Sequence, residues 1–275
     1  MSVLRAIASE FQKAFTTRMW WLLAILLIAY VAFLAGGLGA FLGWASENPD
    51  AAASAGNTQI PPGEFLAPLI YSFASSVGYV FPVLLGALAV TGEFRHKTLT
   101  PTFLAQPNRS LVLGAKFTTQ LVMGAGLGVI AFVTSVGLGA AALSAFGLGT
   151  GLDNSDTWAL IARGVLAMAL WATIGVGLGS LVPNQVATIV IVIAFTQFLE
   201  PVLRLAASLN SVTANIGQFL PGAASDALVG ASFYTLAAAG PGQSLEWWQG
   251  GLVLLAIGVI ATVIGGATTW RRDVT

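Results

Sequence analysis

Few residues of this chain could carry out chemistry, and most of them stand at two places. The charged or titratable members of the two groups are Glu93, Arg95, His96 and Lys97 in the first and Glu200 and Arg204 in the second. The histidine could act as a base or as a metal ligand, or it could be a loop residue that contacts a partner. An acid four residues before an arginine could form an ion pair on one face of a helix.

The patterns that catalysis would need are missing. The run that comes nearest to a phosphate-binding loop is Leu113-Gly114-Ala115-Lys116, which lacks both the first glycine and the hydroxyl residue of that motif. His96, the single histidine, lies outside the apolar segments, and none of these segments contains the aspartate pair of an intramembrane protease. With one histidine and no cysteine, a metal site is not expected either. We therefore predict that the chain is not an enzyme, with no catalytic residue and no metal ligand.

The composition is that of an integral membrane protein. Hydrophobic residues make up 56% of the 275 residues and charged residues only 8%, with a mean hydropathy of +0.85. A soluble domain carries about 25% charged residues. The net charge of zero argues against a nucleic-acid partner.

Six apolar segments are long enough to cross a bilayer, which predicts a single all-α transmembrane domain over 1–275. The predicted spans are 19–44, 65–91, 111–146, 158–182, 186–205 and 248–270. Residues 1–18 have the apolar periodicity of an interfacial helix, and the long segment 206–246 is expected to contain short helices. Pro82 predicts a kink near Gly78–Pro82. The Gly-x-x-x-Gly patterns at Gly124 and Gly175 indicate close packing of helices within one subunit.

Lysine and arginine are distributed unequally between the two ends of these spans. Six spans place both termini on one side, together with Arg5, Lys13, Arg18, Arg95, Lys97, Arg109, Lys116, Arg271 and Arg272. Only Arg163 and Arg204 fall on the other side. The positive-inside rule therefore predicts cytoplasmic termini.

The longest polar interruption, 92–110, follows the second span. Pro101 and Pro107 disfavour one continuous helix, so we expect a short helix from about Glu93 to Thr100, an elbow, and a return to the membrane at Ser110. From charge alone this is a solvated loop between two spans.

The order of its residues resembles that of permease subunits of ABC-2 type transporters. The chain has Gly92-Glu93-Phe94-Arg95-His96-Lys97-Thr98-Leu99, then Leu104-Ala105-Gln106-Pro107-Asn108-Arg109, then Lys116. The family usually has Glu-Tyr/Phe-Arg-x-Gly-Thr-Leu, then Leu-Ala-x-Pro-x-x-Arg, then a lysine. Lys97 stands where the family often has glycine, and Pro101 has no counterpart.

The resemblance covers the whole chain and implies a role for each part. Residues 1–18 correspond to a connecting helix, 92–110 to a cytoplasmic coupling helix, and 206–246 to extracellular re-entrant helices. The residues expected to contact a separate ABC ATPase subunit are Glu93, Phe94, Arg95, His96, Lys97, Leu99, Phe103 and Arg109. ATP and Mg²⁺ would be bound by the ATPase, so no cofactor is expected in this chain. The resemblance further implies a homodimer paired through spans 1 and 5, two ATPase copies, export, and the bacterial inner membrane.

The second group leaves two interpretations open. Glu200 and Arg204 could pair within the helix at the outer headgroup level, or they could form a polar element at the outer mouth of a translocation path. Gln197, one turn earlier, is expected on the same side, and Pro201 is expected to bend the helix. Two other functions also remain open for the whole chain: a six-span channel or secondary transporter working alone, and a membrane anchor or sensor subunit.

The predicted topology can be tested with single cysteines, because the chain has none of its own. Cysteines at Asn57 and Ser225 should react with an impermeant thiol reagent in intact cells, whereas one at Asn108 should react only after permeabilisation. The opposite labelling pattern would reverse the orientation.

Overall fold

The computed structural model describes residues 2–54, 63–207, 211–231 and 245–270, and the ordered secondary structure in these ranges is helical. Six stretches are long and apolar enough to cross a membrane, as the sequence predicts, so the chain is a multi-pass membrane protein. They are α2 (Met19–Glu47), α4 (Gly63–Ser76) with α5 (Val80–Arg95), α7 (Arg109–Ala145), α8 (Ser155–Leu181), α9 (Gln185–Ala194) with the π-helix η1 (Phe195–Leu199) and α10 (Glu200–Ala207), and α14 (Trp247–Thr268).

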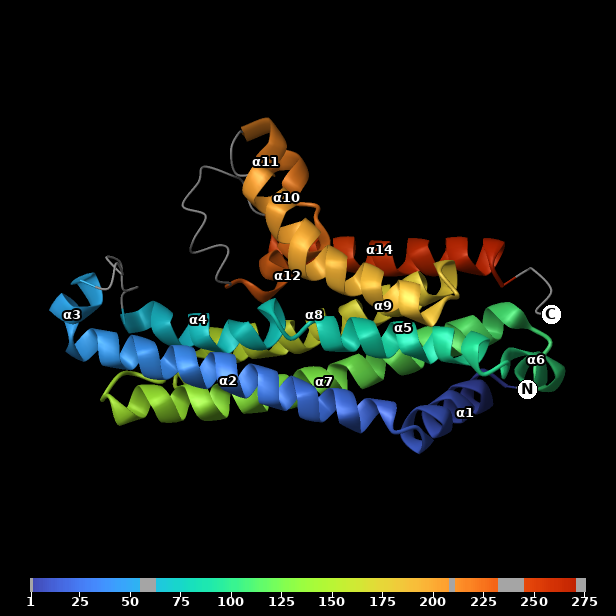
Figure 1. Ribbon diagram of the computed structural model, residues 1–275, viewed down its shortest axis with the longest axis horizontal. Coiled ribbons are helices and arrows are strands. Elements are labelled where there is room, and N and C mark those ends of the chain that lie inside the picture. The colour runs from blue at the N-terminus through green and yellow to red at the C-terminus, as the bar shows by residue number, and fades with distance from the viewer. Residues whose placement is uncertain (1, 55–62, 208–210, 232–244, 271–275) are drawn as a thin grey trace.

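Five shorter helices lie at the ends of these spans or beside them. They are α1 (Val3–Thr16), α3 (Pro49–Ser54), α6 (Leu99–Ala105), α11 (Ser211–Gly217) and α12 (Pro221–Val229). Figure 1 shows α1, α6 and the last turn of α14 at one end of the bundle. The same figure shows α10 and α11 standing out from the bundle, whereas α12 lies beside the first turns of α14.

Helix α8 is the centre of the bundle and packs against α5, α7 and α14. Glycines allow these close approaches. A Cβ on Gly124 of α7 would lie 2.6 Å from the Ala172 Cβ, and one on Gly175 of α8 would lie 2.1 Å from the Val83 carbonyl oxygen of α5. Both Gly-x-x-x-Gly patterns thus pack helices within one chain, which confirms that prediction.

The second span is broken where the sequence predicts a kink. Helix α4 ends at Ser76 and α5 begins at Val80. Pro82 has no N–H, so it cannot donate the next hydrogen bond that α4 would need. A helix that ends just before Pro82 leaves fewer carbonyl groups unpaired than one that continues through it. The break places Tyr79 near the middle of the span, where its ring stacks on Trp171 of α8 with centroids 4.4 Å apart.

The predicted helix in the polar stretch after the second span is misplaced. We expected it at Glu93–Thr100, but α5 continues to Arg95 and a separate helix, α6, begins at Leu99. Pro101 does not break α6, because it lies in the first turn, where a missing N–H leaves no helical hydrogen bond unmade.

The segment 206–246 contains two described helices, α11 and α12, while 208–210 and 232–244 lie outside the described residues. Helix α12 packs against α14, α8 and α4. Ser225 is buried there and accepts a hydrogen bond from Trp171 Nε1 at 3.1 Å. A cysteine at that position would be shielded from any reagent, so the exposed Asn215 of α11 is the better labelling site.

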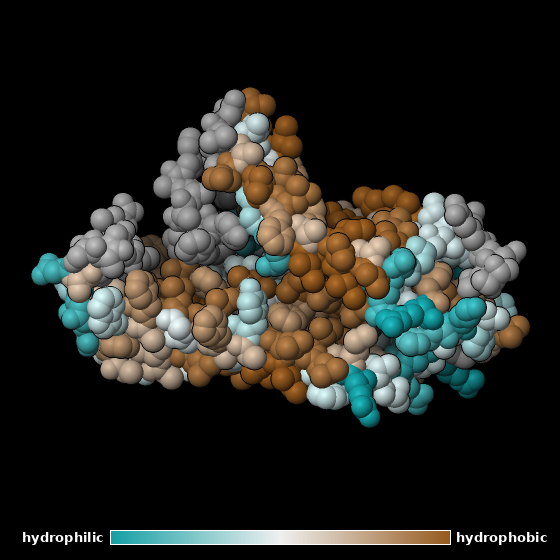
Figure 2. All heavy atoms as spheres, viewed as in Figure 1, coloured by the Kyte–Doolittle hydropathy of each residue, from teal (hydrophilic) through white to brown (hydrophobic). Residues whose placement is uncertain are grey.

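The surface has the pattern of a membrane protein. Figure 2 shows hydrophobic residues over the middle of the molecule and hydrophilic residues gathered at the end where α1 and α6 lie. Exposed apolar side chains such as Phe33, Val133 and Val186 belong to this apolar surface. Lipid chains would cover them in the bilayer.

The glycine contacts of α8 can be tested by a matched pair on α7. Alanine at Gly124 would lie 2.6 Å from the Ala172 Cβ and 2.9 Å from the Met168 carbonyl oxygen, whereas alanine at Gly126 meets nothing within 4 Å. We expect G124A to lower the apparent melting temperature in detergent, since overpacking costs about 1–3 kcal/mol. G126A should leave it unchanged or raise it, because alanine favours helix. Equal melting of the two variants would contradict this packing.

Candidate functional site

The polar end of the molecule is organised by the turn that links α5 to α6. The Lys97 N–H bonds the Phe94 carbonyl at 3.3 Å and the Thr98 N–H bonds the Glu93 carbonyl at 3.0 Å. Lys97 has a φ of 54°, the one positive φ of a non-glycine residue in the described ranges. This is the hydrogen-bond pattern of a Schellman motif, which favours glycine at this position.

Glu93 lies just before this turn and belongs to a buried cluster of four charges. Its Oε1 contacts Lys13 Nζ at 2.9 Å and Lys116 Nζ at 2.8 Å. Glu10 joins the same two lysines, with Lys13 Nζ at 2.7 Å and Lys116 Nζ at 2.6 Å. The side chain of Lys116 is only 2% exposed. Two acids and two bases, which we call the four-charge cluster, thereby connect α1, α5 and α7.

Glu10 is a charged residue of the amphipathic helix α1, yet it is buried. Its burial is possible because Lys116 of α7 supplies a counter-charge inside the chain. Burial alone would lower the pKa of Lys13, but the hydrogen bond from Glu10 and the charge of Glu93 outweigh it and leave the Lys13 pKa raised. Lys13 therefore stays protonated throughout the neutral range.

Trp270 anchors the other side of α6. Its ring packs edge-on against Phe103 with centroids 5.5 Å apart and against Phe94 at 6.4 Å. The Arg109 guanidinium lies over the Phe103 ring at 4.9 Å and donates a hydrogen bond to the Trp270 carbonyl oxygen at 2.5 Å. Leu99 is completely buried in the same apolar cluster. Helix α6 is thus held by α5, α7 and the end of α14.

The structure separates the residues predicted to contact an ATPase into three sets. Arg95, His96 and Lys97 are exposed, as expected. Glu93 and Leu99 are buried, so the prediction that they are exposed is wrong. The other three, Phe94, Phe103 and Arg109, are half-buried in the contacts with Trp270.

Sequence reasoning also missed an apolar side chain on this surface. Leu104 of α6 is 80% exposed beyond the ends of the spans. We call Arg95, His96, Lys97 and Leu104 the exposed tip.

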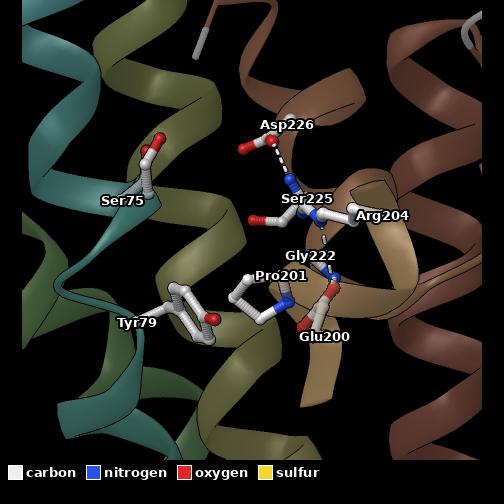
Figure 3. A pocket seen from close by; sticks show the side chains of 9 residues that line it. Ser75, Tyr79, Glu200, Pro201, Arg204, Gly222, Ser225 and Asp226 are labelled. Atoms are coloured by element: carbon white, nitrogen blue, oxygen red, sulfur yellow. Dashed lines mark hydrogen bonds and ion pairs between the residues drawn. The ribbon is translucent and has the colours of Figure 1, made fainter. Parts of the chain in front are cut away.

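The second group forms a buried site between α10 and α12 (Figure 3). The Arg204 guanidinium contacts Asp226 Oδ2 at 2.6 Å through Nη1 and Glu200 Oε1 at 3.4 Å through Nε. The Gly222 N–H donates a hydrogen bond to the same Oε1. A Cβ on Gly222 would lie 2.3 Å from both Glu200 Oε1 and Arg204 Nη2, so a larger residue would displace these two side chains. We call Glu200, Arg204 and Asp226 the buried triad.

Glu200 and Arg204 pair within the helix, as the first sequence interpretation expects, but the pair is not solvated. Their side chains are only 2% and 14% exposed. A role in a translocation path stays a prediction. Gln197 is exposed and does not line the site. The reason is η1, because its wider turn rotates Gln197 away from the position that an α-helix would give it relative to Glu200.

Sequence reasoning did not assign four of these residues to a site: Asp226 of the buried triad, and Glu10, Lys13 and Lys116 of the four-charge cluster. Asp226 is the lone charged residue between Arg204 and Glu246, which is the signal that could have singled it out. Lys116 follows the polar stretch by several apolar residues, and a buried lysine requires an acid nearby. The described residues do not bring together three side chains of the types that hold a metal ion.

The four-charge cluster can be tested by removing its most buried member. K116M would leave Glu10 and Glu93 without their buried cation, and breaking a buried pair costs about 3 kcal/mol or more. We expect a lower apparent melting temperature in detergent. The control is K97M, which removes an exposed lysine and should not change the melting temperature. If K116M and K97M have the same apparent melting temperature, the four-charge cluster does not stabilise the fold.

Comparison with known proteins adds no assignment. The sequence matches no protein-family model, and no curated protein matches it.

Proposed function

We propose that the chain is the membrane subunit of an ABC-2 type transporter, which exports its substrate using ATP hydrolysed by a separate ATPase subunit. The observation that carries the proposal is the exposed tip, formed by the end of α5, the turn after it and the firmly held helix α6. An exposed leucine and cationic side chains on one polar end fit an interface, because apolar anchors with a polar rim are typical of protein contacts.

The turn at Lys97 supports the family resemblance. ABC-2 permeases often have glycine at this position, and here the backbone has the left-handed conformation that favours glycine. A lysine costs about 1 kcal/mol or more in that conformation. Its presence is therefore better explained by a use for its charge, such as contact with an acidic patch on the ATPase.

The contacts between the exposed tip and the bundle suggest how a movement of α6 could be transmitted to the spans. Glu93 links the end of α5 to α1 and α7, and Trp270 links α6 to α14. Movement of α6 would therefore shift these helices together. In the proposed cycle, closure of the two ATPase subunits moves α6 in each of the two copies of the chain. This movement shifts the spans between an inward-facing and an outward-facing state.

The proposed dimer would use two of the three least buried spans. The buried share of the apolar window is 22% in the α9–α10 span, 28% in α14 and 33% in α2, against 61% in α8. The family resemblance assigns the dimer contact to α2 and the α9–α10 span. The proposed location is the bacterial inner membrane, with both termini and the exposed tip in the cytoplasm.

A channel or secondary transporter is the second candidate. The observation that favours it is the buried triad, because charged residues inside a span often mark a substrate or ion path. Such a protein would function without an ATPase.

The proposal predicts that an ATP-hydrolysing protein co-purifies with the tagged chain from its native membranes, and that the contact depends on the exposed tip. L104S should reduce the bound ATPase about tenfold, as expected for the loss of an apolar anchor. I216S is the matched control, because Ile216 is 70% exposed on α11, at a distance from the tip. It should bind the ATPase normally.

Two results would contradict the proposal. One is the absence of an ATP-hydrolysing partner after chemical cross-linking in native membranes. The other is transport by vesicles that contain the purified chain alone without ATP, which would favour the secondary transporter.

A further inference from the structure

The buried triad lies within the thickness that lipid chains would cover. Along the helix axis, at 1.5 Å per residue, Glu200 is about 22 Å from Gln185 at the start of α9. Tyr79, which lines the same site, is about 24 Å from Arg95 at the end of α5. The hydrocarbon core of a bilayer is about 30 Å thick. Glu200 is about 10 Å from Ala207 at the other end of the fifth span, and Arg204 is closer to that end. The triad thus lies toward the Ala207 end of the span but within a thickness of about 30 Å. Because its side chains are almost fully buried, their charges must be neutralised locally.

The triad contains two carboxylates and one guanidinium. Arg204 forms its shorter ion pair with Asp226, through Nη1 at 2.6 Å. Its contact with Glu200, through Nε, is longer at 3.4 Å. Arg163 of α8 also lies near α12, but its guanidinium is over the Trp247 ring. Tyr79 is the remaining titratable group of the site, and its hydroxyl donates a hydrogen bond to the Thr196 carbonyl oxygen at 3.0 Å. Of the two acids, Glu200 has the weaker pairing.

Half of the Glu200 carboxyl group has no partner. Oε1 accepts the Gly222 N–H, but Oε2 is buried with no hydrogen bond, in a residue that is 1% exposed. An ionised oxygen in that state would cost several kcal/mol. Two carboxylates that share one site commonly retain one proton between them. A proton on Oε2 removes the excess charge and turns the oxygen into a donor.

The site has room for the acceptor that this donor needs. Glu200 and Ser76 line the same cavity of about 10 Å³, and Ser76 Oγ is also buried without a hydrogen-bond partner. A volume near that size holds one water molecule when polar groups surround it. One water could accept from Oε2 and donate to Ser76 Oγ, which would satisfy both orphan atoms.

We propose that Glu200 is a proton-binding site: its Oε2 carries a proton in this conformation and bonds a single enclosed water at Ser76. The Arg204–Asp226 pair then remains as a neutral ion pair. The inference stands apart from the proposed function and does not depend on an ATPase.

The placement of the site links the proton to a movement. Glu200 belongs to α10, and the amide and acid that complete the site belong to α12. Separation of the two helices would admit water, and the hydrated carboxyl group would release its proton. Since the closed arrangement holds one proton more than the open one, lower pH favours closure.

The test is infrared spectroscopy of the purified chain in lipid vesicles at neutral pH. A protonated carboxyl group has a C=O stretch at higher frequency than a carboxylate, and the band shifts on deuterium exchange. We expect this band in the unmodified chain and its loss in E200Q. Since E200Q resembles the protonated side chain in shape and charge, it should also fold and melt as the unmodified chain does.

A second measurement covers the case in which a variant fails to fold. Labelling the glutamate side-chain carboxyls with carbon-13 should shift the band in the unmodified chain, whereas labelling those of aspartate should not. The absence of the band, or a band that follows the aspartate label, would overturn the assignment. A band that appears only in sodium-free buffer would also overturn it, in favour of a cation site.

Discussion

Lipid chains cannot solvate a charge, and this constraint explains how the distant parts of the chain are held together. The spans gain little from apolar contact with one another, since the surrounding lipid is just as apolar. The four-charge cluster connects the N-terminal helix to two spans, and the buried triad connects the end of the fifth span to α12. In each set the charged residues come from segments far apart in the sequence. Each set therefore fixes a tertiary contact that secondary-structure propensity alone would not specify.

Close backbone approach provides the second kind of contact, and it divides the bundle into an inner and an outer part. Helix α8 is in contact with α5, α7 and α14 at glycines where a side chain would collide with backbone atoms. The fifth span lacks such contacts along most of its length, and α10 stands out from the bundle (Figure 1). A rigid centre with one loosely packed span is an arrangement that permits one part to move while the rest keeps its shape.

The sequence predicts the local features of this fold well and the long-range ones poorly. Hydropathy predicts all six spans, and Pro82 predicts the break in the second span, because both depend on neighbouring residues. The burial of Glu10 depends on a lysine 106 positions away, and the pairing of Arg204 depends on an acid in a separate helix. In the candidate site the exposure of the cations Arg95 and Lys97 was predicted, but the burial of Glu93 was not. The error followed from placing a helix where the chain makes a left-handed turn.

The π-helix at Phe195–Leu199 has a consequence for the fifth span as a mechanical element. One turn there contains a residue more than an α-helical turn, so the apolar stripe of α9 does not continue in phase into α10. The surplus residue can move along a helix one step at a time without unwinding it. A step that carried the surplus residue past Glu200 would turn this residue about the axis by about 100°, the twist of one residue in an α-helix. Such a step would move the carboxyl group away from Gly222.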